Sequence, residues 1–269
     1  MGLTRRKDNK PTDEMPFWEH ADVLRNTVFH MLIGIGAAFV LWFFVLPYIF
    51  DSVILGPTSS FFFLWRWFNT IAASVIPAFE ATAFSTRIIN INIASQFMTH
   101  MEVALYLAVI TTIPYLAYAL WKFIRPALHP EEEKSISTAF LSRGALFYAG
   151  ILVGYALIFP ITFRFLIEYT LSTGVSNQFN LNSYVSMFLS MITIMGISFE
   201  FPILAWTLSS LGLIDKPLLR KYRKHAVVTI MIVVAIMTPT GDPFTMLITA
   251  FPLYLLYELS IRLVKEHHG

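Results

Sequence analysis

The chain has 269 residues, of which 56% are hydrophobic and only 13% charged, and its mean hydropathy is +0.64. A soluble domain carries about 25% charged residues, so this composition excludes an ordinary soluble protein and indicates one that crosses a membrane several times. Cysteine is absent, which excludes disulfides, thiol catalysis and zinc–thiolate sites. The net charge of +2 excludes little by itself, and the positions of the charges are more informative.

Apolar stretches long enough to cross a hydrocarbon core of about 30 Å predict an all-α integral membrane protein with six spans. In chain order these spans are residues 27–49, 101–121, 144–166, 184–212, 226–238 and 244–261, which together form one membrane domain over residues 27–261. Residues 1–26 are polar and are predicted to be a cytoplasmic segment rather than a cleavable signal peptide. Residues 262–269 are predicted to be a cytoplasmic tail.

The stretch "FFFLWRWFNTIAASVIPAF", residues 61–79, could be a seventh span. Membrane proteins concentrate lysine and arginine on the cytoplasmic side. With six spans and a cytoplasmic N-terminus, only Arg66, Arg87 and Arg164 of the 19 lysines and arginines fall outside, whereas seven spans place more of them outside than inside. The charges therefore favour six spans, with residues 61–79 as an aromatic helix lying in the membrane interface.

The last two spans are joined by the tight turn "TPTGDPF", and the first of them, 226–238, is only about 20 Å long. Either this hairpin is short and thins the bilayer, or the helix continues through Thr238; the spacing leaves both readings open. Five of the spans contain a proline, at Pro47, Pro114, Pro160, Pro202 and Pro252. Proline removes a backbone hydrogen bond, so we expect kinked helices in a curved arrangement.

Glu200 stands in the apolar run "TIMGISFEFPILAW", residues 193–206, roughly 24 Å from the outer end of its predicted span. An ionisable residue at this depth is by default a candidate functional site. It either meets a polar group on another helix or a substrate, or is hydrogen-bonded within its own fold. Tyr155 is a candidate internal partner, although simple packing also explains a single tyrosine, and Asp242 fits an N-cap of the last span.

The loop "FIRPALHPEEEKS", residues 123–135, carries three consecutive carboxylates on a face that is otherwise basic. They are either a solvated charge run at the start of a helix, with Pro130 in its first turn, or a patch for a cationic partner. Arginine would suit such a patch, because its guanidinium pairs bidentately with carboxylates. The segment "EHADVLR" adds Glu19 and Asp22 on the same predicted side.

These segments, in this order, resemble the TatC family, the multispanning subunits of the twin-arginine translocase. "EHADVLR" resembles the family's His-Leu-x-Glu-Leu-Arg, and "FIRPALHPEEEK" is similar to its Phe-x-x-Pro-x-Leu-x-x-x-Glu loop. "GISFEFP" resembles Gly-x-x-Phe-Glu-x-Pro, and "MTPTGDPFTMLITAFPLYLLYELSI" is similar to the last hairpin. The resemblance covers roughly residues 17–263, and it includes two short last spans.

The resemblance implies a cytoplasmic receptor site for twin-arginine signal peptides, in a protein that exports folded proteins across the bacterial cytoplasmic membrane using the proton gradient. The residues it assigns to signal-peptide binding are Glu132, with Glu131 beside it, and Asp22, Arg25, His20, Phe123, Pro126 and Leu128. The intramembrane polar positions it assigns to contacts with partners are Glu200, Tyr155, Thr238, Asp242 and Glu258. The implied partners are single-span TatA/TatB-type subunits and further copies of the chain, with no nucleic acid, metal, cofactor or enzymatic activity.

Two positions depart from the family pattern. Val23 stands where the N-terminal motif has its second glutamate. Either Asp22 supplies that carboxylate or Glu131 and Glu133 compensate; we favour Asp22, although one residue along a helix is a turn of about 100°. Glu102 stands near a position where relatives often carry lysine.

The alternative function is a secondary transporter of a small solute that uses Glu200 within an inverted repeat of three spans and three spans. Against it, the first outer loop has about fifty residues and the middle one under twenty, and the halves share no motif. An intramembrane aspartyl protease is disfavoured because "GD" at 241–242 has no second intramembrane aspartate with which to form a dyad.

Overall fold

The computed structural model describes residues 17–59, 62–75, 86, 88–124, 144–172, 177–210, 212–238 and 241–264, and nearly all of them are helical. The N-terminal elements are α1 (Phe17–Ile49), the π-helical turn η1 (Phe50–Ile54), the 3-10 turn η2 (Gly56–Thr58), α2 (Phe63–Val75), β1 (Ile88–Ile89) and α3 (Ser95–Ile124). The helical stretch Gly144–Glu168 follows and contains the π-helical turn η4 (Gly154–Ile158) and α5 (Phe159–Glu168). The remaining elements are β2 (Phe179–Asn180), α6 (Leu181–Phe199), α7 (Phe201–Ser210), α8 (Lys216–Lys221), α9 (Arg223–Met237) and α10 (Pro243–Leu263).

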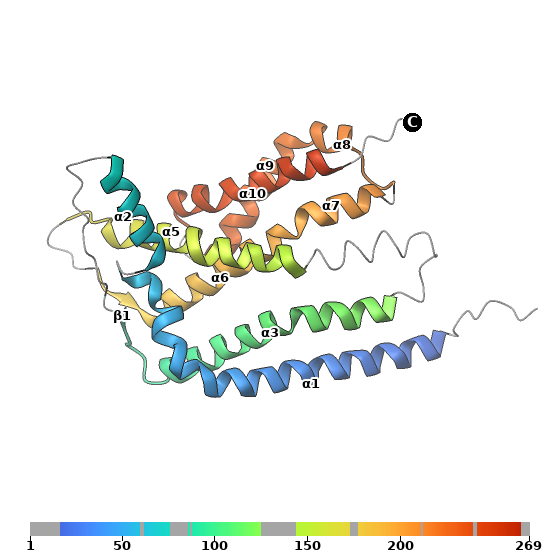
Figure 1. The fold of residues 1–269 in the computed structure, drawn as a ribbon, viewed down its shortest axis with the longest axis horizontal. Helices are drawn as coiled ribbons and strands as arrows, with labels where there is room; N and C mark the ends of the chain where they lie inside the picture. Colours follow the sequence, from blue (N-terminus) through green and yellow to red (C-terminus); the bar gives the residue numbers. More distant parts are fainter. Residues whose placement is uncertain are drawn as a thin grey trace, which may run out of the picture.

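The long helices are roughly parallel or antiparallel to one another (Figure 1). The pair α1 and α3 lies at one edge of the molecule, and the pair α9 and α10 lies at the other. The start of α1, α8 and the end of α10 lie at one end of the molecule, which we call the α8 end. The opposite end, which we call the α2 end, carries α2 and β1, and α2 runs across the direction of the long helices. The two ends of the described chain therefore lie at the same end of the molecule.

Five helical stretches are long and apolar enough to cross a membrane: Asp22–Thr58, Ser95–Leu120, Gly144–Glu168, Leu181–Ser210 and Pro243–Leu263. Each contains or largely overlaps a predicted span. The stretch predicted at 226–238 is also helical, but α9 has 15 residues and a length of only about 22 Å. It ends at Met237, so the reading in which the helix continues through Thr238 is wrong.

The prediction that the last helix is short is also wrong. The helix α10 has 21 residues and is about 31 Å long, because Asp242 caps it, Pro243 begins it, and it continues to Leu263. The predicted interfacial stretch 61–79 contains α2, an aromatic helix of 13 residues. Only one helix of the final hairpin is therefore shorter than a typical span.

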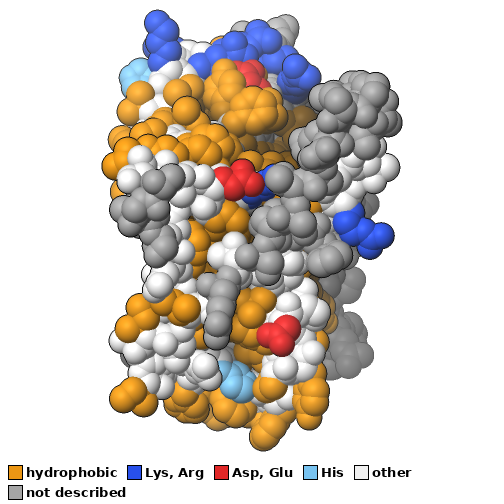
Figure 2. Space-filling view, turned by 90° about the vertical axis from the view of Figure 1, so that its left-hand side faces the viewer, with side chains coloured by type: hydrophobic (Ala, Val, Ile, Leu, Met, Phe, Trp, Pro, Cys, Tyr) orange, Lys and Arg blue, Asp and Glu red, His pale blue; other side chains and the backbone are white. Residues whose placement is uncertain are grey.

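Large apolar side chains are exposed along the flanks of the molecule. In the most apolar part of α1 none of the residues is buried, and Leu32 is 62% and Phe44 69% exposed. Figure 2 shows hydrophobic side chains over much of the surface seen from the α2 end, with lysines and arginines gathered along the edge where α8 and α9 lie. Apolar surface of this extent is tolerated in lipid and not in water, so the chain is a multi-pass membrane protein.

Three of the five prolines stand next to irregular backbone. Pro47 precedes η1, and Pro160 follows η4. Pro202 follows Glu200, where α6 ends and α7 begins, so the predicted span 184–212 consists of two helices. Each proline lacks the N–H that the carbonyl four residues earlier would accept. At Pro160 and Pro202 this carbonyl lies in the π-turn or at the break itself, where the chain relaxes. The helices α3 and α10 continue through Pro114 and Pro252.

The helix α6 forms the centre of the core and contacts α3, α5, α9 and α10. Its close approach to the helix that begins at Gly144 depends on glycine. A Cβ on Gly150 would overlap the carbonyl oxygen of Met195, and one on Gly154 would lie 3.0 Å from the Cα of Ile192. Membrane helices associate through such small residues, because lipid supplies no hydrophobic force to bring larger surfaces together.

Side-chain hydrogen bonds fix the α2 end. The hydroxyls of Tyr155 and Tyr184 donate to the carbonyls of Val53 and Ile54, at 3.0 and 2.6 Å. These carbonyls lie where the first helix ends, and terminal carbonyls need partners from outside the helix. The side-chain oxygen of Asn182 accepts from the hydroxyls of Ser95 and Thr99, joining the starts of α3 and α6, and β1 pairs in parallel with β2.

Candidate functional site

A groove of about 680 Å³ opens between the first turns of α1 and the last turns of α3, at the α8 end. It is lined by Asp22, Val23, Asn26, Thr27, His30, Tyr115, Tyr118, Ala119, Lys122 and Phe123. The two helices lie close here because Gly34 leaves room for the ring of Tyr115, whose Cε1 would be 3.0 Å from a Cβ at that position. Deeper along the pair, Trp42 Nε1 donates to Thr111 Oγ1 at 3.1 Å.

Three of the residues predicted to bind the signal peptide meet at this groove. Asp22 and Phe123 line it from the two helices. Arg25 Nη2 lies 3.5 Å from Asp22 Oδ1, and the two side chains are 83% and 72% exposed. An ion pair this exposed contributes little free energy, so the Asp22 carboxylate can exchange Arg25 for a guanidinium from outside at small cost.

Val23, which stands in place of the family glutamate, lines the same groove as Asp22. The turn of about 100° between adjacent residues therefore does not send Asp22 to another surface. The groove is wide enough to receive side chains from both positions. Asp22 thus presents a carboxylate on the surface of the groove that Val23 also lines.

The other predicted signal-peptide residues cannot be placed in the same way. Pro126, Leu128, Glu131 and Glu132 lie outside the described residues, and His20 belongs to the first turn of α1. The segment that carries Glu131 and Glu132 follows directly on Ile124, the last residue of α3. It is therefore joined covalently to the helix that forms one wall of the groove.

Glu200 occupies the break between α6 and α7 and is half-buried. Its backbone N–H donates to the carbonyl of Ile197 at 3.1 Å, and its own carbonyl accepts from Leu204 N at 3.0 Å. Tyr155 is not its internal partner, because the tyrosine hydroxyl donates to Val53. Tyr155 belongs instead to an aromatic cluster with Phe62 and Phe188.

Thr238 and Asp242 shape the hairpin between α9 and α10. Thr238 is buried, and its hydroxyl donates to the carbonyl of Val234 at 2.8 Å. Asp242 Oδ1 accepts from the backbone N–H of Thr245 at 2.7 Å, which confirms the predicted N-cap. Both side chains satisfy local backbone groups at a helix end.

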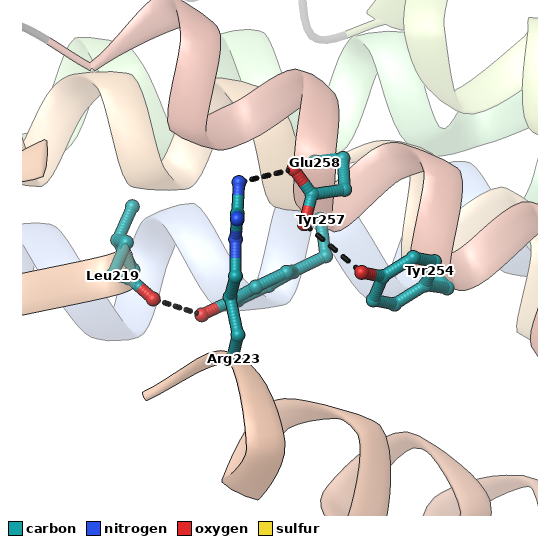
Figure 3. A network of polar contacts seen from close by, with 5 residues as sticks. All are labelled: Leu219, Arg223, Tyr254, Tyr257 and Glu258. Carbon is teal, nitrogen blue, oxygen red and sulfur yellow. Dashed lines mark hydrogen bonds and ion pairs between the residues drawn. The ribbon is translucent and has the colours of Figure 1, made fainter. Parts of the chain in front are cut away.

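Glu258 connects α10 to the corner between α8 and α9 (Figure 3). Arg223 Nη2 donates to Glu258 Oε2 at 2.7 Å, and the Tyr254 hydroxyl donates to Glu258 Oε1 at 3.1 Å. The residue before Glu258 is Tyr257, and its hydroxyl donates to the carbonyl of Leu219 at 2.7 Å. The carboxylate predicted to contact a partner thus stabilises the attachment of the short helix α9.

Sequence reasoning missed several residues of these two sites. His30, Tyr115 and Tyr118 face the groove but belong to apolar helical stretches with no motif of their own. Arg223 was predicted only to be one of the lysines and arginines on the inner side of the membrane. Glu258, a carboxylate in an apolar span, was a signal that a cationic partner lies nearby. Among the residues that the structure describes, no group of three or more histidine, aspartate or glutamate side chains could hold a metal ion.

These observations define a class: a multi-pass helical membrane protein with an open groove at one end that is lined by charged and aromatic side chains, a carboxylate at a helix break in its centre, and a short penultimate helix. A family model described as "Sec-independent protein translocase protein (TatC)" matches residues 19–252. The chain belongs to the TatC family.

Individual relatives agree with this assignment. A Sec-independent protein translocase protein TatC from Blattabacterium sp. subsp. Periplaneta americana is 33% identical over 252 residues, which cover 93% of this chain and 94% of the relative. The protein of the same name from Escherichia coli K12 is 29% identical over 193 residues, which cover 72% of this chain and 74% of the relative. A crystal structure described as the twin arginine translocase receptor TatC matches with a TM-score of 0.69 and 25% identity, over 91% of this chain and 97% of that one.

Proposed function

We propose that the chain is the receptor of a twin-arginine translocase and binds paired-arginine signal peptides at the α8 end. The observation that carries this proposal is the groove between α1 and α3, which brings Asp22 and Phe123 together beside the start of the segment that contains Glu132. Its support from outside the chain is the family match and the crystal structure described as a twin arginine translocase receptor. No catalytic step is needed for this function.

In this account the two guanidinium groups of a signal peptide meet Asp22 and Glu132. Arg25 leaves Asp22 as the peptide arrives, since its exposed ion pair is weak. Arginine is preferred to lysine because its planar fork can make two parallel hydrogen bonds to one carboxylate. The rings of Tyr115, Tyr118 and Phe123 offer apolar and aromatic surface to the peptide residues beside the arginines.

The same proposal assigns the membrane part of the molecule to assembly. Glu200, at the break between α6 and α7, is the polar contact for single-span TatA/TatB-type subunits or for the inserted signal peptide. The chain crosses the bacterial cytoplasmic membrane six times within residues 27–261 and self-associates in a larger complex. Residues 1–26 and 262–269 are cytoplasmic, so the α8 end faces the cytoplasm, and the proton gradient drives export of folded proteins.

Site-specific photocrosslinking tests the proposal. A photoreactive residue in a twin-arginine signal peptide should crosslink to the wild-type protein, and Glu132→Ala should reduce that crosslink at least tenfold, since a charge-assisted pair contributes about 1.5–3 kcal/mol. Glu102→Ala is the matched control, because it removes an exposed carboxylate from the opposite half of α3, away from the groove, and it should keep the crosslink. Undiminished crosslinking in Glu132→Ala would show that the assigned receptor site is wrong.

A further inference from the structure

A proline interrupts the backbone hydrogen bonding of α3 beside the groove between α1 and α3. Pro114 has no N–H, so the carbonyl of Ile110, four residues earlier, loses its partner within the helix. An unpaired carbonyl is costly in lipid, because no water is present to replace the missing donor. The hydroxyl of Tyr148, in the helical stretch Gly144–Glu168, donates to this carbonyl at 2.8 Å. A side chain of another helix therefore supplies the hydrogen bond that the proline removes.

The same arrangement is present at the α2 end. Pro47 deprives the carbonyl of Phe43 of its partner in α1, and His100 Nε2 of α3 lies 2.7 Å from this carbonyl oxygen. A carbonyl can only accept, so we assign the ring hydrogen to Nε2. The imidazole also stacks on the ring of Phe43, with centroids 4.2 Å apart. The link at His100 is far from the groove, whereas the link at Tyr148 lies next to it.

Pro114 divides α3 at the point where the groove ends. All the residues by which α3 lines the groove, from Tyr115 to Phe123, follow the proline. From Pro114 to Phe123 the rise along the helix is about 14 Å. A change of about 10° in the bend at the proline would therefore move the end of this wall by roughly 2 Å. The width of the groove depends on how α3 is held at Pro114.

The turn before Pro114 is also prone to bending. The hydroxyls of Thr111 and Thr112 each donate at 2.7 Å to the carbonyl four residues earlier in α3. Threonine hydroxyls that bond back to their own helix in this way often bend it. The hydroxyl of Tyr148 holds this bent segment from a separate helix, so it can fix the direction of the bend.

We propose that Tyr148 is a positioning residue for signal-peptide binding. Its hydrogen bond to the carbonyl of Ile110 fixes the direction in which α3 continues past Pro114, and with it the width of the groove. This role rests on the proposed receptor function. Tyr148 is not one of the described residues that line the groove, so it acts on the peptide only through α3. Because the bond replaces one that the proline removed, the effect of Tyr148 depends on Pro114.

A double-mutant cycle tests this dependence, with the affinity of the purified full-length protein for a fluorescent twin-arginine signal peptide as the measurement. Tyr148→Phe keeps the ring and removes the hydroxyl, and it should lower the affinity about fivefold, which corresponds to one hydrogen bond. In the Pro114→Ala background the carbonyl of Ile110 regains a donor within α3, so Tyr148→Phe should lower the affinity less than about twofold. His100→Phe is the matched control, because it removes the equivalent bond at the α2 end, and it should leave the affinity unchanged.

A distance between spin labels reports the position of α3 without any peptide. The chain has no cysteine, and Val28→Cys with Leu120→Cys places labels at exposed positions of α1 and α3 outside the groove lining. Tyr148→Phe should shift or broaden the distribution of distances between the two labels. In the Pro114→Ala background the same substitution should leave the distribution unchanged.

Four results would contradict the proposal: an unchanged affinity in Tyr148→Phe, an unchanged label distance, equal losses of affinity in both backgrounds, or an equal loss in His100→Phe. The last result would mean that the loss comes from general destabilisation rather than from the direction of α3. If the wild-type protein does not bind the twin-arginine peptide, the receptor function itself is wrong. If it binds the peptide and Tyr148→Phe has no effect, only the role of Tyr148 is wrong.

Discussion

Glu258 lies in an apolar helix, yet its carboxylate accepts hydrogen bonds from Arg223 and Tyr254. A charge in this setting is costly when it has no partner, so the pair stabilises the fold mainly by avoiding an uncompensated carboxylate. The side chains are 24% exposed at Glu258 and 46% at Arg223, which limits the net gain. At the scale of single residues, these polar groups of α10 thus stabilise the packing of α9 against α10.

A double-mutant cycle measures this pair. Arg223→Gln and Glu258→Gln should each lower the unfolding midpoint, and the double variant should be more stable than the sum of the two losses predicts, with a coupling free energy of about 1 kcal/mol. Thermal unfolding in detergent is the measurement. Arg262→Gln, which changes an exposed cation near the end of the same helix, serves as the control and should have little effect. Strictly additive losses would mean that the two side chains do not stabilise each other.

At the scale of helices, α6 and the helical stretch Gly144–Glu168 approach each other so closely that their backbones are nearly in contact. Gly150 and Gly154 are four residues apart and face Met195 and Ile192. Helix α6 packs in turn against α3, α9 and α10, so its position relative to this neighbour sets the positions of the others. The absence of side chains at Gly150 and Gly154 therefore determines how the helices of the core are positioned.

Gly150→Val should destabilise the protein strongly, because the added Cβ overlaps a backbone carbonyl that cannot move without α6. Overpacking of this kind costs about 1–3 kcal/mol, and we expect the upper part of that range or a failure to fold. Gly36→Val is the matched control, since a Cβ at this position in α1 meets no atom within 4 Å. Fluorescence-detected chromatography after heating compares the variants. Equal stability of the two would contradict this account of the packing.

Helix ends were harder to predict than helix positions. The span predicted at 27–49 belongs to a helix that begins at Phe17, because Glu19, Asp22 and Arg25 continue the helix beyond its apolar part. Hydropathy marks where a helix meets lipid, and backbone hydrogen bonding continues past that point. The break at Glu200 was hidden for a related reason: Pro202 predicted a kink, but apolar residues continue on both sides of it.

For the molecule as a whole, both ends of the described chain lie at the α8 end (Figure 1). The basic residues of α8 and the start of α9 lie at this end too, and cytoplasmic loops of membrane proteins are rich in such residues. This arrangement is what the proposed six spans, with both termini cytoplasmic, require.

Cysteine labelling tests this topology directly, since the chain has no cysteine of its own. Thr70→Cys in α2 and Leu171→Cys after α5 should react with a membrane-impermeant maleimide in intact cells. Lys224→Cys and Arg262→Cys should react only after the membrane is opened. Labelling of all four positions from the same side would contradict the six-span arrangement.

The candidate site was partly predictable. Arg25 and Phe123 carry motif positions and Asp22 stands next to one, and the structure brings these three residues together. The pairing of α1 with α3 that creates the groove depends on contacts between residues far apart in sequence, such as Trp42 with Thr111. A contact between distant residues produces no pattern in the sequence around either of them. The contribution of Tyr115 to the groove could therefore not be predicted from the residues next to it.

The central claim is that carboxylates at the α8 end recognise a pair of arginines by their shape. The most direct measurement is the affinity of the purified protein for one precursor that carries two arginines and for the same precursor with two lysines. The account predicts that the arginine precursor binds at least tenfold more tightly, because lysine keeps the charge and loses the bidentate geometry. Equal affinities for the two precursors would contradict it.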